Sequence, residues 1–558
     1  MFKKINLEYI FLTVFVFIFF FIGLANMWDN NISHDFPYAY LASDGFQHES
    51  NSQYVKDGGK VQFSPFYLAG GYKNVYTPHP PQLWILSAIF SKFSGLEAYD
   101  SIYFLVYLFI VVSSIIMYLI IRQFSKNLAI ISLPLSLLVL ANPFRVGLFW
   151  GQWLYITGAF FMVCVFWYMS KSNLNGGFIV LSLFLASTML SHPPEAVFSV
   201  FFVLASLVVS FIKKRLSRDL IKNVILGGII SFLLSFFYIN IFLRSVFLVE
   251  RVRGIRGGKI LTQAVGFPFT ISLFDFKIYA IFILTGILLF FFYKKFRNNY
   301  AGIIGIFAFI IGYANYIGLG KRAFATRFFW PIYFSLFFGL IIYFIMKLII
   351  KRLSVVHALL ISILFIGLIS TPLYSQTKTG SGIMNKYDWS ALNWIKENLK
   401  EDDIYYILYS DTLSQAAAIY NSKRVAFLVS TDKYIESIKE NKIKATYQFA
   451  LVDSWEVLLC DRGFFSYGYY VDALHTNKSF CNPDYIKYKS LVVQENLCNM
   501  GYYYFSKAAS QPILAQYNLA IRGVLLKNDW IKEVYSNELV SILKNSKPGV
   551  DCIGNITA

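Results

Sequence analysis

Long apolar blocks dominate the first two-thirds of the chain. Most of them are close to the roughly 20 residues that an α-helix needs to cross the apolar core of a bilayer. The pattern therefore predicts an α-helical polytopic membrane protein. Its eleven predicted spans are residues 9–28, 99–121, 127–143, 149–169, 176–191, 194–212, 223–247, 276–293, 301–319, 328–346 and 355–373.

A polar stretch separates the first two spans. It runs from Asp29 to about Pro81 and is followed by the apolar segment 82–95, which is too short to span a bilayer comfortably. We predict that residues 29–98 form one large loop on the outer side of the membrane. The short apolar segment within this loop is predicted to be a helix lying at the interface.

The pattern changes after residue 375, where the transmembrane domain (1–375) is predicted to end. Short runs such as Ile404–Tyr409 and Arg424–Ser430 alternate apolar and polar residues, which indicates strands, and stretches with helical spacing surround them. Residues 376–558 are therefore predicted to form a soluble domain of the α/β or α+β class, with a length in the usual range.

Composition supports this picture and excludes some functions. Hydrophobic residues make up 57% of the chain and charged residues only 15%, which excludes a disordered chain and argues against a single soluble domain. The formal net charge is +19, and residues 1–375 account for almost all of it, with 30 basic and 12 acidic residues. A nucleic-acid-binding protein would concentrate such charge on a soluble domain, so no nucleic-acid partner is expected.

The basic residues also predict an orientation. Sixteen of them, against two acidic residues, fall in the N-terminus and in the loops after the even-numbered spans. Cytoplasmic loops of membrane proteins are enriched in Lys and Arg. We therefore expect a multi-pass protein of the cytoplasmic membrane, with the N-terminus in the cytoplasm and the C-terminal domain outside the cell.

The cysteines agree with an outer domain. Cys164 lies within a predicted span, and the other four cysteines all lie after residue 375. In an oxidising compartment four cysteines allow two disulfides, in any of three pairings. Four free thiols are the alternative. The four residues are Cys460, Cys481, Cys498 and Cys552.

Two acid–histidine pairs are candidates for chemistry. If residues 44–56 are helical, Asp44 and His48 lie one turn apart on one face, and a carboxylate beside an imidazole can act as a general base or bind a metal. The alternative is an Asp that caps a helix, followed by a solvated His. His192 and Glu195 occupy a very short outer loop beside prolines, where a polar pair is costly unless it faces a cavity or a partner. Ordinary helix-end chemistry is the alternative there.

Basic residues on the predicted outer side form the third candidate. They oppose the charge bias that orients the protein, which suggests a functional reason for them, because Lys and Arg near a bilayer surface can bind phosphate groups. Anionic lipid headgroups are the alternative ligand. The sequence has no P-loop and no dinucleotide-binding glycine pattern, so an ATP-driven mechanism is disfavoured. The residues are Arg251, Arg253 and Arg256 in one loop and Lys321, Arg322 and Arg327 in another.

The order of the motifs resembles the GT-C superfamily of membrane glycosyltransferases. It is most similar to a group of prokaryotic, often archaeal, multi-pass proteins, and the resemblance covers residues 1 to about 430. The shared features are an Asp-x-x-x-His, a Gly-Gly-Tyr followed by Pro-Pro, a His-Pro in a middle outer loop, an Arg-aromatic-x-x-Pro element and a Trp-containing helix that opens the soluble domain. In this chain they are Asp44–His48, Gly70–Tyr72, Pro80–Pro81, His192–Pro193, Arg327–Pro331 and Asp388–Asn398.

The resemblance implies a sugar donor linked to a polyprenyl phosphate, such as dolichyl phosphate. It also implies that Asp44 is the catalytic base or a metal ligand. Gly45 stands where an acidic pair would have its second member, so metal binding of the oligosaccharyltransferase kind does not carry over directly. A divalent metal such as Mg²⁺ or Mn²⁺ stays open as a cofactor, with Asp44, His48, His192 and Glu195 as its candidate ligands.

The resulting hypothesis is an inverting glycosyltransferase of cell-envelope glycosylation. Asp44 would act as the base, assisted by His48, and the outer basic residues would bind the donor phosphate. The expected partners are the lipid-linked donor, membrane lipids and a glycan, lipid or protein acceptor. Two other classes stay open, namely a polytopic transporter or lipid flippase, and a non-catalytic membrane assembly protein. A transporter would show internal repeats and ionisable residues at mid-membrane depth, and an assembly protein would tolerate the loss of Asp44.

Overall fold

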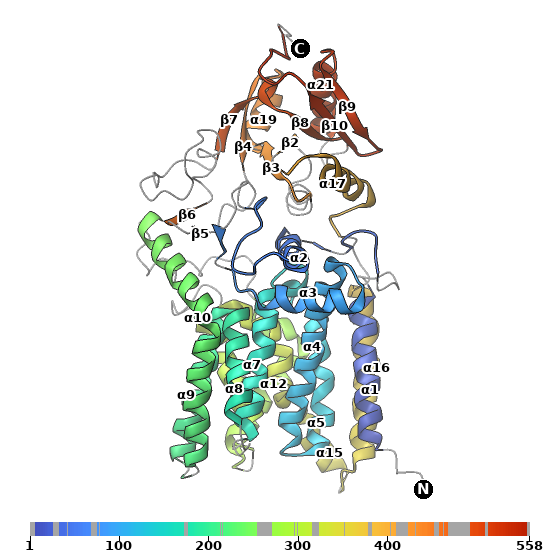
Figure 1. The fold of residues 1–558 in the computed structure, drawn as a ribbon. Helices are drawn as coiled ribbons and strands as arrows, with labels where there is room; N and C mark the ends of the chain where they lie inside the picture. The colour runs from blue at the N-terminus through green and yellow to red at the C-terminus, as the bar shows by residue number, and fades with distance from the viewer. Residues whose placement is uncertain are drawn as a thin grey trace.

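A bundle of helices forms one end of the molecule and a β-sheet region the other (Figure 1). The computed structural model places the N-terminus at the end of the bundle far from the sheet. The structure describes residues 6–25, 33–38, 40–41, 43–68, 75–77, 79–171, 177–212, 214, 216–253, 271–294, 296–297, 299–314, 323–350, 352–377, 382–401, 403–408, 422–429, 431–450, 457–460, 463–466, 492–507 and 512–554.

Helices long and apolar enough to cross a membrane number seven in the described part of the chain. Four shorter apolar helices take the positions of the remaining predicted spans, so the polytopic fold predicted from the sequence is confirmed. The elements of the bundle are α1 (Leu7–Leu24), α4 (Ala98–Arg122), α5 (Lys126–Ser132) with the 3-10 helix η1 (Leu133–Leu140), α7 (Trp153–Lys171), α8 (Gly177–Ser191), α9 (Pro193–Ile212), α10 (Arg218–Arg253), α12 (Ile278–Phe292), α13 (Tyr300–Tyr313), η5 (Ala323–Phe329) with α14 (Trp330–Tyr333) and α15 (Ser335–Ile349), and α16 (Val355–Thr377).

Two helices differ from the predicted bounds for identifiable reasons. The helix α10 has 36 residues, whereas the hydropathy pattern predicts 223–247, because polar helix-forming residues extend the helix beyond its apolar part. The span predicted over 127–143 is divided into α5 and η1, and Pro134 lies in the first turn of η1. Proline has no amide hydrogen for the α-helical hydrogen bond, which favours the change of helix type there.

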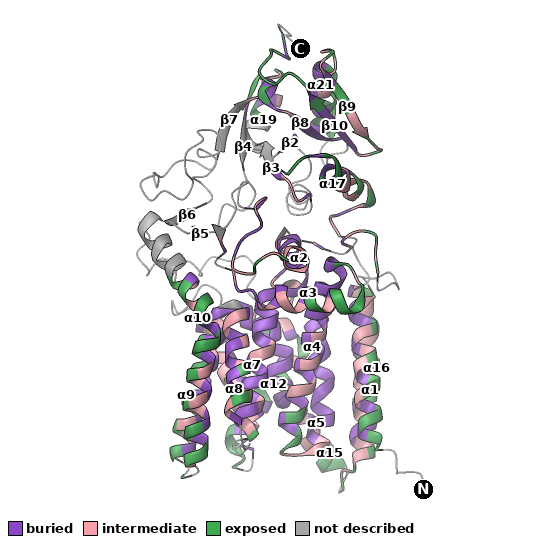
Figure 2. Cartoon of the chain, viewed as in Figure 1, coloured by how far each residue is buried: buried purple, intermediate pink, exposed green. Residues whose placement is uncertain are grey.

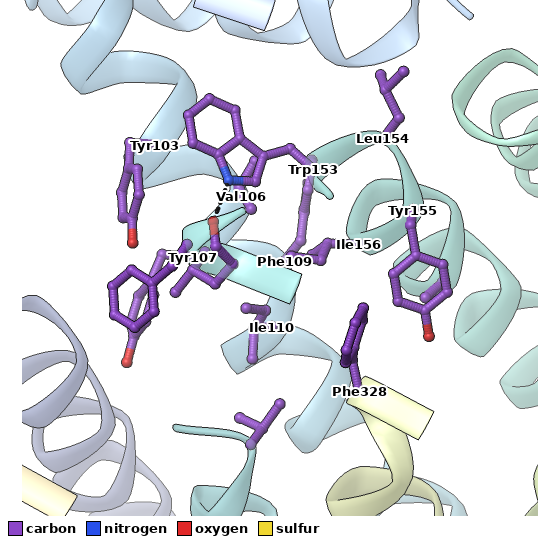
Figure 3. Packing of buried hydrophobic residues seen from close by; sticks show 14 of the residues in the cluster. Tyr103, Val106, Tyr107, Phe109, Ile110, Trp153, Leu154, Tyr155, Ile156 and Phe328 are labelled. Atoms are coloured by element: carbon purple, nitrogen blue, oxygen red, sulfur yellow. Dashed lines mark hydrogen bonds between the residues drawn. The ribbon is translucent and has the colours of Figure 1, made fainter. Parts of the chain in front are cut away.

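Many residues on the outer faces of the bundle are exposed, whereas its interior is buried (Figure 2). Large apolar residues of α9 and α10, such as Phe201, Phe211 and Leu233, are more than half exposed, which suits contact with lipid tails. Figure 3 shows the interior around Trp153, where aromatic rings dominate. The rings of Tyr103 and Trp153 meet edge to face, with centroids 5.5 Å apart.

A buried carboxylate with two ion pairs joins three helices at the end of the bundle where the chain begins. The carboxylate of Glu8 on α1 is 1% exposed and pairs with Arg122 of α4 and with Lys126 of α5, whose Nζ is 2.7 Å away. Tyr118 also donates a hydrogen bond to this carboxylate. Because a buried carboxylate is tolerated only when it is paired and hydrogen-bonded, this network fixes α1 against its neighbours.

Two short helices cover the opposite end of the bundle (Figure 1). They are α2 (Ser43–Lys56) and α3 (Gln82–Ser94), and α3 is the short helix that the sequence predicts over 82–95. Leu83 and Trp84 of α3 are buried, whereas Phe93 is 88% exposed. The helix ends at Gly95, whose φ of 74° is the left-handed conformation that glycine adopts without strain.

The C-terminal region contains a seven-stranded mixed sheet. Its order is β7-β4-β3-β2-β8-β10-β9, with β2 parallel to both β3 and β8 and the remaining pairs antiparallel. This arrangement agrees with the predicted α/β or α+β class. The elements are α17 (Lys386–Asn398), β2 (Ile404–Leu408), β3 (Val425–Val429), α19 (Thr431–Lys439), β4 (Thr446–Ala450), β7 (Val492–Asn496), β8 (Tyr502–Ser506), α21 (Pro512–Leu525), β9 (Ile531–Ser536) and β10 (Val540–Asn545).

A second, small sheet connects the loop after α1 with the C-terminal region. Its order is β1-β5-β6, in which β1 (Val75–Tyr76) pairs antiparallel with β5 (Val457–Cys460), and β6 (Gly463–Ser466) follows. The pairing aligns Val75 with Cys460. Two chain segments nearly 400 residues apart therefore share a sheet on the side of the bundle that carries α2 and α3.

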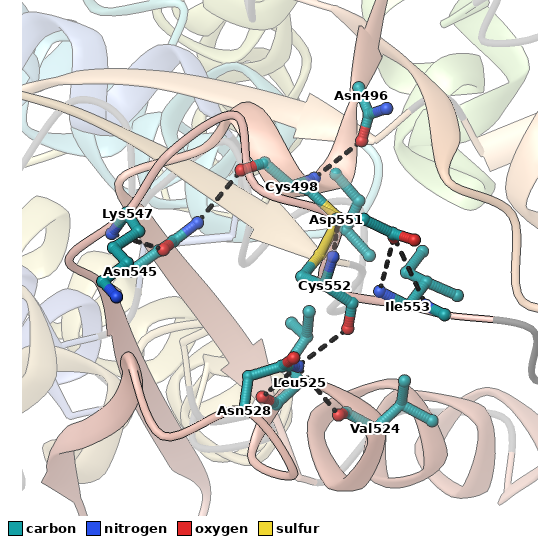
Figure 4. The surroundings of a disulfide bond; sticks show 12 residues. Asn496, Cys498, Val524, Leu525, Asn528, Asn545, Lys547, Asp551, Cys552 and Ile553 are labelled. Atoms are coloured by element: carbon teal, nitrogen blue, oxygen red, sulfur yellow. Dashed lines mark hydrogen bonds between the residues drawn. A yellow bond between two sulfur atoms is a disulfide. The ribbon is translucent and has the colours of Figure 1, made fainter.

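A disulfide joins Cys498 to Cys552 near the end of the chain (Figure 4). Asn545 donates a hydrogen bond to the carbonyl of Cys498, and Asn528 donates one to the carbonyl of Cys552. Of the remaining cysteines predicted to pair, Cys481 lies outside the described residues, and only the backbone of Cys460 is described. The buried Cys164 is a free thiol.

Candidate active site

Asp44 lies in the first turn of α2, at the point where α2 meets the start of α7. Its carboxylate is half-buried, and Gln152 Nε2 lies 3.4 Å from Oδ2. The first turn of a helix favours a negative charge, because the free amide groups point toward it. The neighbouring Gly151 has a φ of 73° and no side chain, which lets the two backbones approach closely.

His48 follows one turn later on the same helix, as the sequence predicts. Its side chain is 5% exposed and lies near two tryptophans, with ring centroids 6.4 Å from Trp84 of α3 and 6.0 Å from Trp153 of α7. Aromatic contacts on both sides hold the imidazole inside the junction of three helices. In this position His48 can anchor α2 against α3 and α7, and so help to hold Asp44 in place.

The proline-rich segment before α3 also contributes to the site. Gln47 of α2 and His79 of this segment are joined by a contact of 3.5 Å between Nε2 atoms, and the His79 ring packs against Trp84. Proline residues Pro80 and Pro81 are buried beside them. The Gly70–Tyr72 motif lies outside the described residues.

His34 pairs with an acid that the sequence analysis does not single out. Asp100, in the first turn of α4, accepts one hydrogen bond from the backbone amide of His34 and contacts its Nδ1, both at 2.8 Å. Tyr99 donates a hydrogen bond to the His34 carbonyl. The only sequence signal for Asp100 is an acidic residue at the first turn of an otherwise apolar span.

His192 and Glu195 are in direct contact at the junction of α8 and α9. Both side chains are buried, and His192 Nδ1 contacts a Glu195 carboxylate oxygen. The pair packs against α7, where a Cβ added to Gly158 would lie 2.7 Å from the His192 Cβ. Asp44, by contrast, contacts Gly151, which precedes Gly158 by seven residues. Seven residues correspond to about 10 Å along a helix, so the two acid–histidine pairs lie apart.

The four candidate metal ligands therefore form two separate pairs. Within the part of the chain that the structure describes, no group of three or more His, Cys, Asp or Glu residues is arranged to hold a metal ion. The described residues do not fit the predicted metal site formed by Asp44, His48, His192 and Glu195, and we derive no reaction step through a metal.

Arg327 lies in the interior of the protein. It is fully buried in η5, and its guanidinium donates hydrogen bonds to the carbonyls of Gly312 at 2.5 Å and Ile271 at 3.0 Å. The ring of Tyr313 lies beneath it, 4.8 Å from the guanidinium carbon. Lys321, Arg322 and Arg256 lie outside the described residues, and only the backbone is described for Arg251 and Arg253, at the end of α10.

Glu49 is a further acidic residue of α2 whose environment no sequence pattern reveals. Its side chain is 5% exposed. Burial raises the pKa of Glu49 to about 8, although the positive charges of Lys423 and Lys396 act in the opposite direction. Glu49 is therefore largely protonated at neutral pH. Lys396 lies on α17 and Lys423 precedes β3, so groups of the C-terminal region lie close to α2.

Comparison with known proteins identifies the fold. No protein-family model matches the chain, and no curated protein matches its sequence. Among solved structures, ArnT from Cupriavidus metallidurans bound to undecaprenyl phosphate is similar, with a TM-score of 0.55, 12% identity and coverage of 97% of this chain and 98% of that chain. The archaeal oligosaccharyltransferase AglB from Archaeoglobus fulgidus, in complex with an inhibitory peptide and a dolichol-phosphate, has a TM-score of 0.54 and 15% identity.

The two similarities differ in extent. The match with AglB covers 76% of this chain but only 64% of the length of AglB, whereas the match with ArnT extends over nearly the whole of both chains. Another AglB structure, described as a complex with Zn and sulfate, has a TM-score of 0.52 and 17% identity. At these identities the similarities show a shared fold. The chain is therefore a polytopic membrane protein with the GT-C-like fold that the sequence predicts.

Proposed function

We propose that the chain is an inverting glycosyltransferase that moves a sugar from a polyprenyl-phosphate-linked donor to an acceptor hydroxyl. The observation that carries the proposal is the position of Asp44. It is a half-buried carboxylate at the first turn of α2, fixed against α7 at the end of the bundle that α3 covers. The similarity to ArnT bound to undecaprenyl phosphate and to AglB bound to a dolichol-phosphate supports a lipid-linked donor.

In the proposed reaction Asp44 accepts the proton of the acceptor hydroxyl as that oxygen attacks the anomeric carbon of the sugar. A new carbon–oxygen bond forms to the acceptor. The bond from the anomeric carbon to the donor phosphate breaks, and its electron pair leaves with the lipid phosphate. Lys321 and Arg322 are proposed to stabilise the charge that develops on this phosphate.

Arg327 has a different role in the proposal. Its guanidinium holds together the carbonyls of Gly312, in the last turn of α13, and of Ile271, which lies seven residues before the start of α12. Because this guanidinium is fully buried and already bonded to two backbone carbonyls, it is better suited to holding the backbone in place than to binding an incoming phosphate. We therefore propose that Arg327 is a positioning residue that supports the segment carrying Lys321 and Arg322, rather than the donor-phosphate ligand expected from the sequence.

The proposal also includes an orientation. The basic residues Arg122 and Lys126 lie at the N-terminal end of the bundle, far from α2 and α3. Since basic residues are enriched on the cytoplasmic side, we propose that Asp44 faces the outside of the cell. Acceptor and donor would then meet at the outer surface of the cytoplasmic membrane.

The test compares membranes that contain the wild-type protein, Asp44→Asn or Asp35→Asn. Asp35 is an exposed acidic residue of the same loop and serves as the matched control. Each membrane receives radiolabelled polyprenyl-phosphate sugars and the native cell-envelope fraction as acceptor. The expected result is transfer by the wild type and by Asp35→Asn, and loss of transfer in Asp44→Asn. Transfer by Asp44→Asn at the wild-type rate would remove Asp44 from the mechanism, and no transfer by the folded wild type from any donor would refute the function.

A further inference from the structure

A cavity of about 90 Å³ lies between α2, the start of α4 and α17. Glu49 of α2 forms part of its wall, and we refer to it as the Glu49 cavity. The exposed side chains of Glu97 and Lys396 lie at its edge, so the cavity is accessible from solvent. Its volume is sufficient for several water-sized groups. Trp389 and Asn393 of α17 are among the other lining residues.

The carboxyl group of Glu49 makes this cavity unusual. The side chain is 95% buried, yet no hydrogen-bond or ion-pair partner for its carboxyl oxygens occurs among the residues that the structure describes. The carboxyl faces a cavity that solvent can enter, so water or a ligand can supply its hydrogen bonds. A ligand that entered the cavity and hydrogen-bonded to this carboxyl would take the place of water there.

The walls of the cavity offer both hydrogen-bond donors and acceptors. Lys423 is paired with Asp57, with 2.6 Å between Nζ and Oδ2, and the carboxyl oxygens of Glu49 can accept hydrogen bonds from a ligand. The amide of Asn393 offers both a donor and an acceptor. These groups match hydroxyl groups, which also donate and accept, better than they match an ion.

Aromatic rings supply the apolar part of the cavity. Trp389 of α17 and Tyr99 of α4 both line it, and their rings meet edge to face with centroids 5.6 Å apart. An amphipathic aromatic ring can cover the C–H face of a ligand while neighbouring polar groups bind its edge. A pyranose ring has this combination of an apolar face and an edge of hydroxyl groups.

We propose that the Glu49 cavity is a binding subsite for a sugar residue of the acceptor, held between the membrane domain and α17. The inference rests on the proposed transfer to an acceptor, and it identifies that acceptor as a glycan or glycolipid. Asp44 and Glu49 are five residues apart on α2, about 7.5 Å along the helix axis. The subsite and the base therefore belong to one rigid element.

The test measures sugar binding directly, without transfer. Purified protein in detergent is mixed with methyl glycosides of glucose, galactose, mannose and N-acetylglucosamine, and binding is measured by saturation-transfer NMR. The wild type is expected to bind at least one of them. Glu49→Leu keeps the wall apolar and of similar volume but removes the hydrogen bonds, and it is expected to weaken binding by about tenfold. Trp389→Ala is expected to weaken it similarly.

Two controls separate binding from folding. Glu49→Gln retains both a donor and an acceptor, so it is expected to bind like the wild type, and so is Glu397→Gln, an exposed change on α17. Glu49→Leu removes a buried carboxyl whose charged form is disfavoured, so it is expected to melt at the wild-type temperature or above it. The inference fails if no glycoside binds to the wild type, or if Glu49→Leu binds as well as the wild type. Either failure leaves the Asp44-dependent transfer assay intact, so the inference and the proposed function are tested separately.

Discussion

The backbone of Gly151 lies so close to Asp44 that a Cβ added to Gly151 would be 2.7 Å from the Asp44 Cβ. The same Cβ would lie 2.5 Å from the Gly45 amide nitrogen, and Gly151 has a left-handed φ of 73°. Real Cβ atoms do not approach other atoms so closely. Glycine at this position is therefore what allows the first turn of α2 to rest on the start of α7, with the Asp44 carboxylate between them.

Replacing Gly151 with alanine is expected to displace Asp44. A misplacement of about 1 Å can lower a rate by about a hundredfold, so we expect Gly151→Ala to reduce kcat of the proposed transfer by about that factor, with a smaller change in the KM for the donor. The matched control is Gly228→Ala in α10, where an added Cβ meets no atom within 4 Å. Wild-type kinetics in Gly151→Ala would show that the position of Asp44 is unimportant.

Much of the fold can be predicted from the sequence, because periodicity and segment length are local properties. The helices α4, α8 and α9 and the strands β2 and β3 lie within a few residues of the predicted positions. The interfacial segment before Gly95 is also predictable, since its apolar run is too short to span a bilayer. The mixed strand order of the large sheet is not, because it depends on pairing between strands far apart in the chain.

In the candidate site, too, local spacing is predictable from the sequence, whereas contacts between distant residues are not. Asp44 and His48 share a helical face, which the spacing of four residues predicts. The contact of His34 with Asp100 joins residues 66 positions apart, and no local pattern indicates it. Glu49 faces a cavity that α17 also lines, and α17 follows more than 300 residues later, so the raised pKa of Glu49 could not be inferred from its neighbours in the sequence.

The Glu8 network is expected to stabilise the bundle. Glu8→Gln leaves Arg122 and Lys126 without their carboxylate partner. Because these two cations are 42% and 34% exposed, water screens part of the interaction, and we expect a loss of about 1–3 kcal/mol rather than the larger cost of a fully buried pair. The measurement is the melting temperature in detergent, with the exposed Glu538→Gln as control. Equal melting temperatures for Glu8→Gln and Glu538→Gln would contradict the expectation.

The disulfide is expected to protect the end of the C-terminal region. It joins residues 54 positions apart, and a cross-link of that span typically contributes about 2–4 kcal/mol. Replacing both Cys498 and Cys552 with serine should therefore make residues 500–550 more sensitive to limited proteolysis. A non-reducing peptide digest of the wild type should contain the two cysteines in one cross-linked peptide, whereas the buried Cys164 should react with an alkylating agent only after unfolding. Absence of that cross-linked peptide would disprove the pairing.

The buried carboxyl of Glu49 makes stability depend on pH. Its pKa rises from 4.5 to about 8 on folding, because burial disfavours the charged form. The folded protein therefore holds this proton more tightly than the unfolded chain does. The stabilisation is fully present below pH 4.5, and it is lost as the pH rises from 4.5 through 8.

Glu49→Gln removes this dependence, because glutamine does not titrate. We expect the variant to gain stability relative to the wild type as the pH rises from 5 to 8, by at most about 1.4 kcal/mol per pH unit. The measurement compares the melting temperatures of Glu49→Gln and the wild type at pH 5 and pH 8. The exposed Glu397→Gln should shift the melting temperature equally at both pH values. The same difference between Glu49→Gln and the wild type at both pH values would mean that Glu49 is already ionised in the folded protein at pH 5.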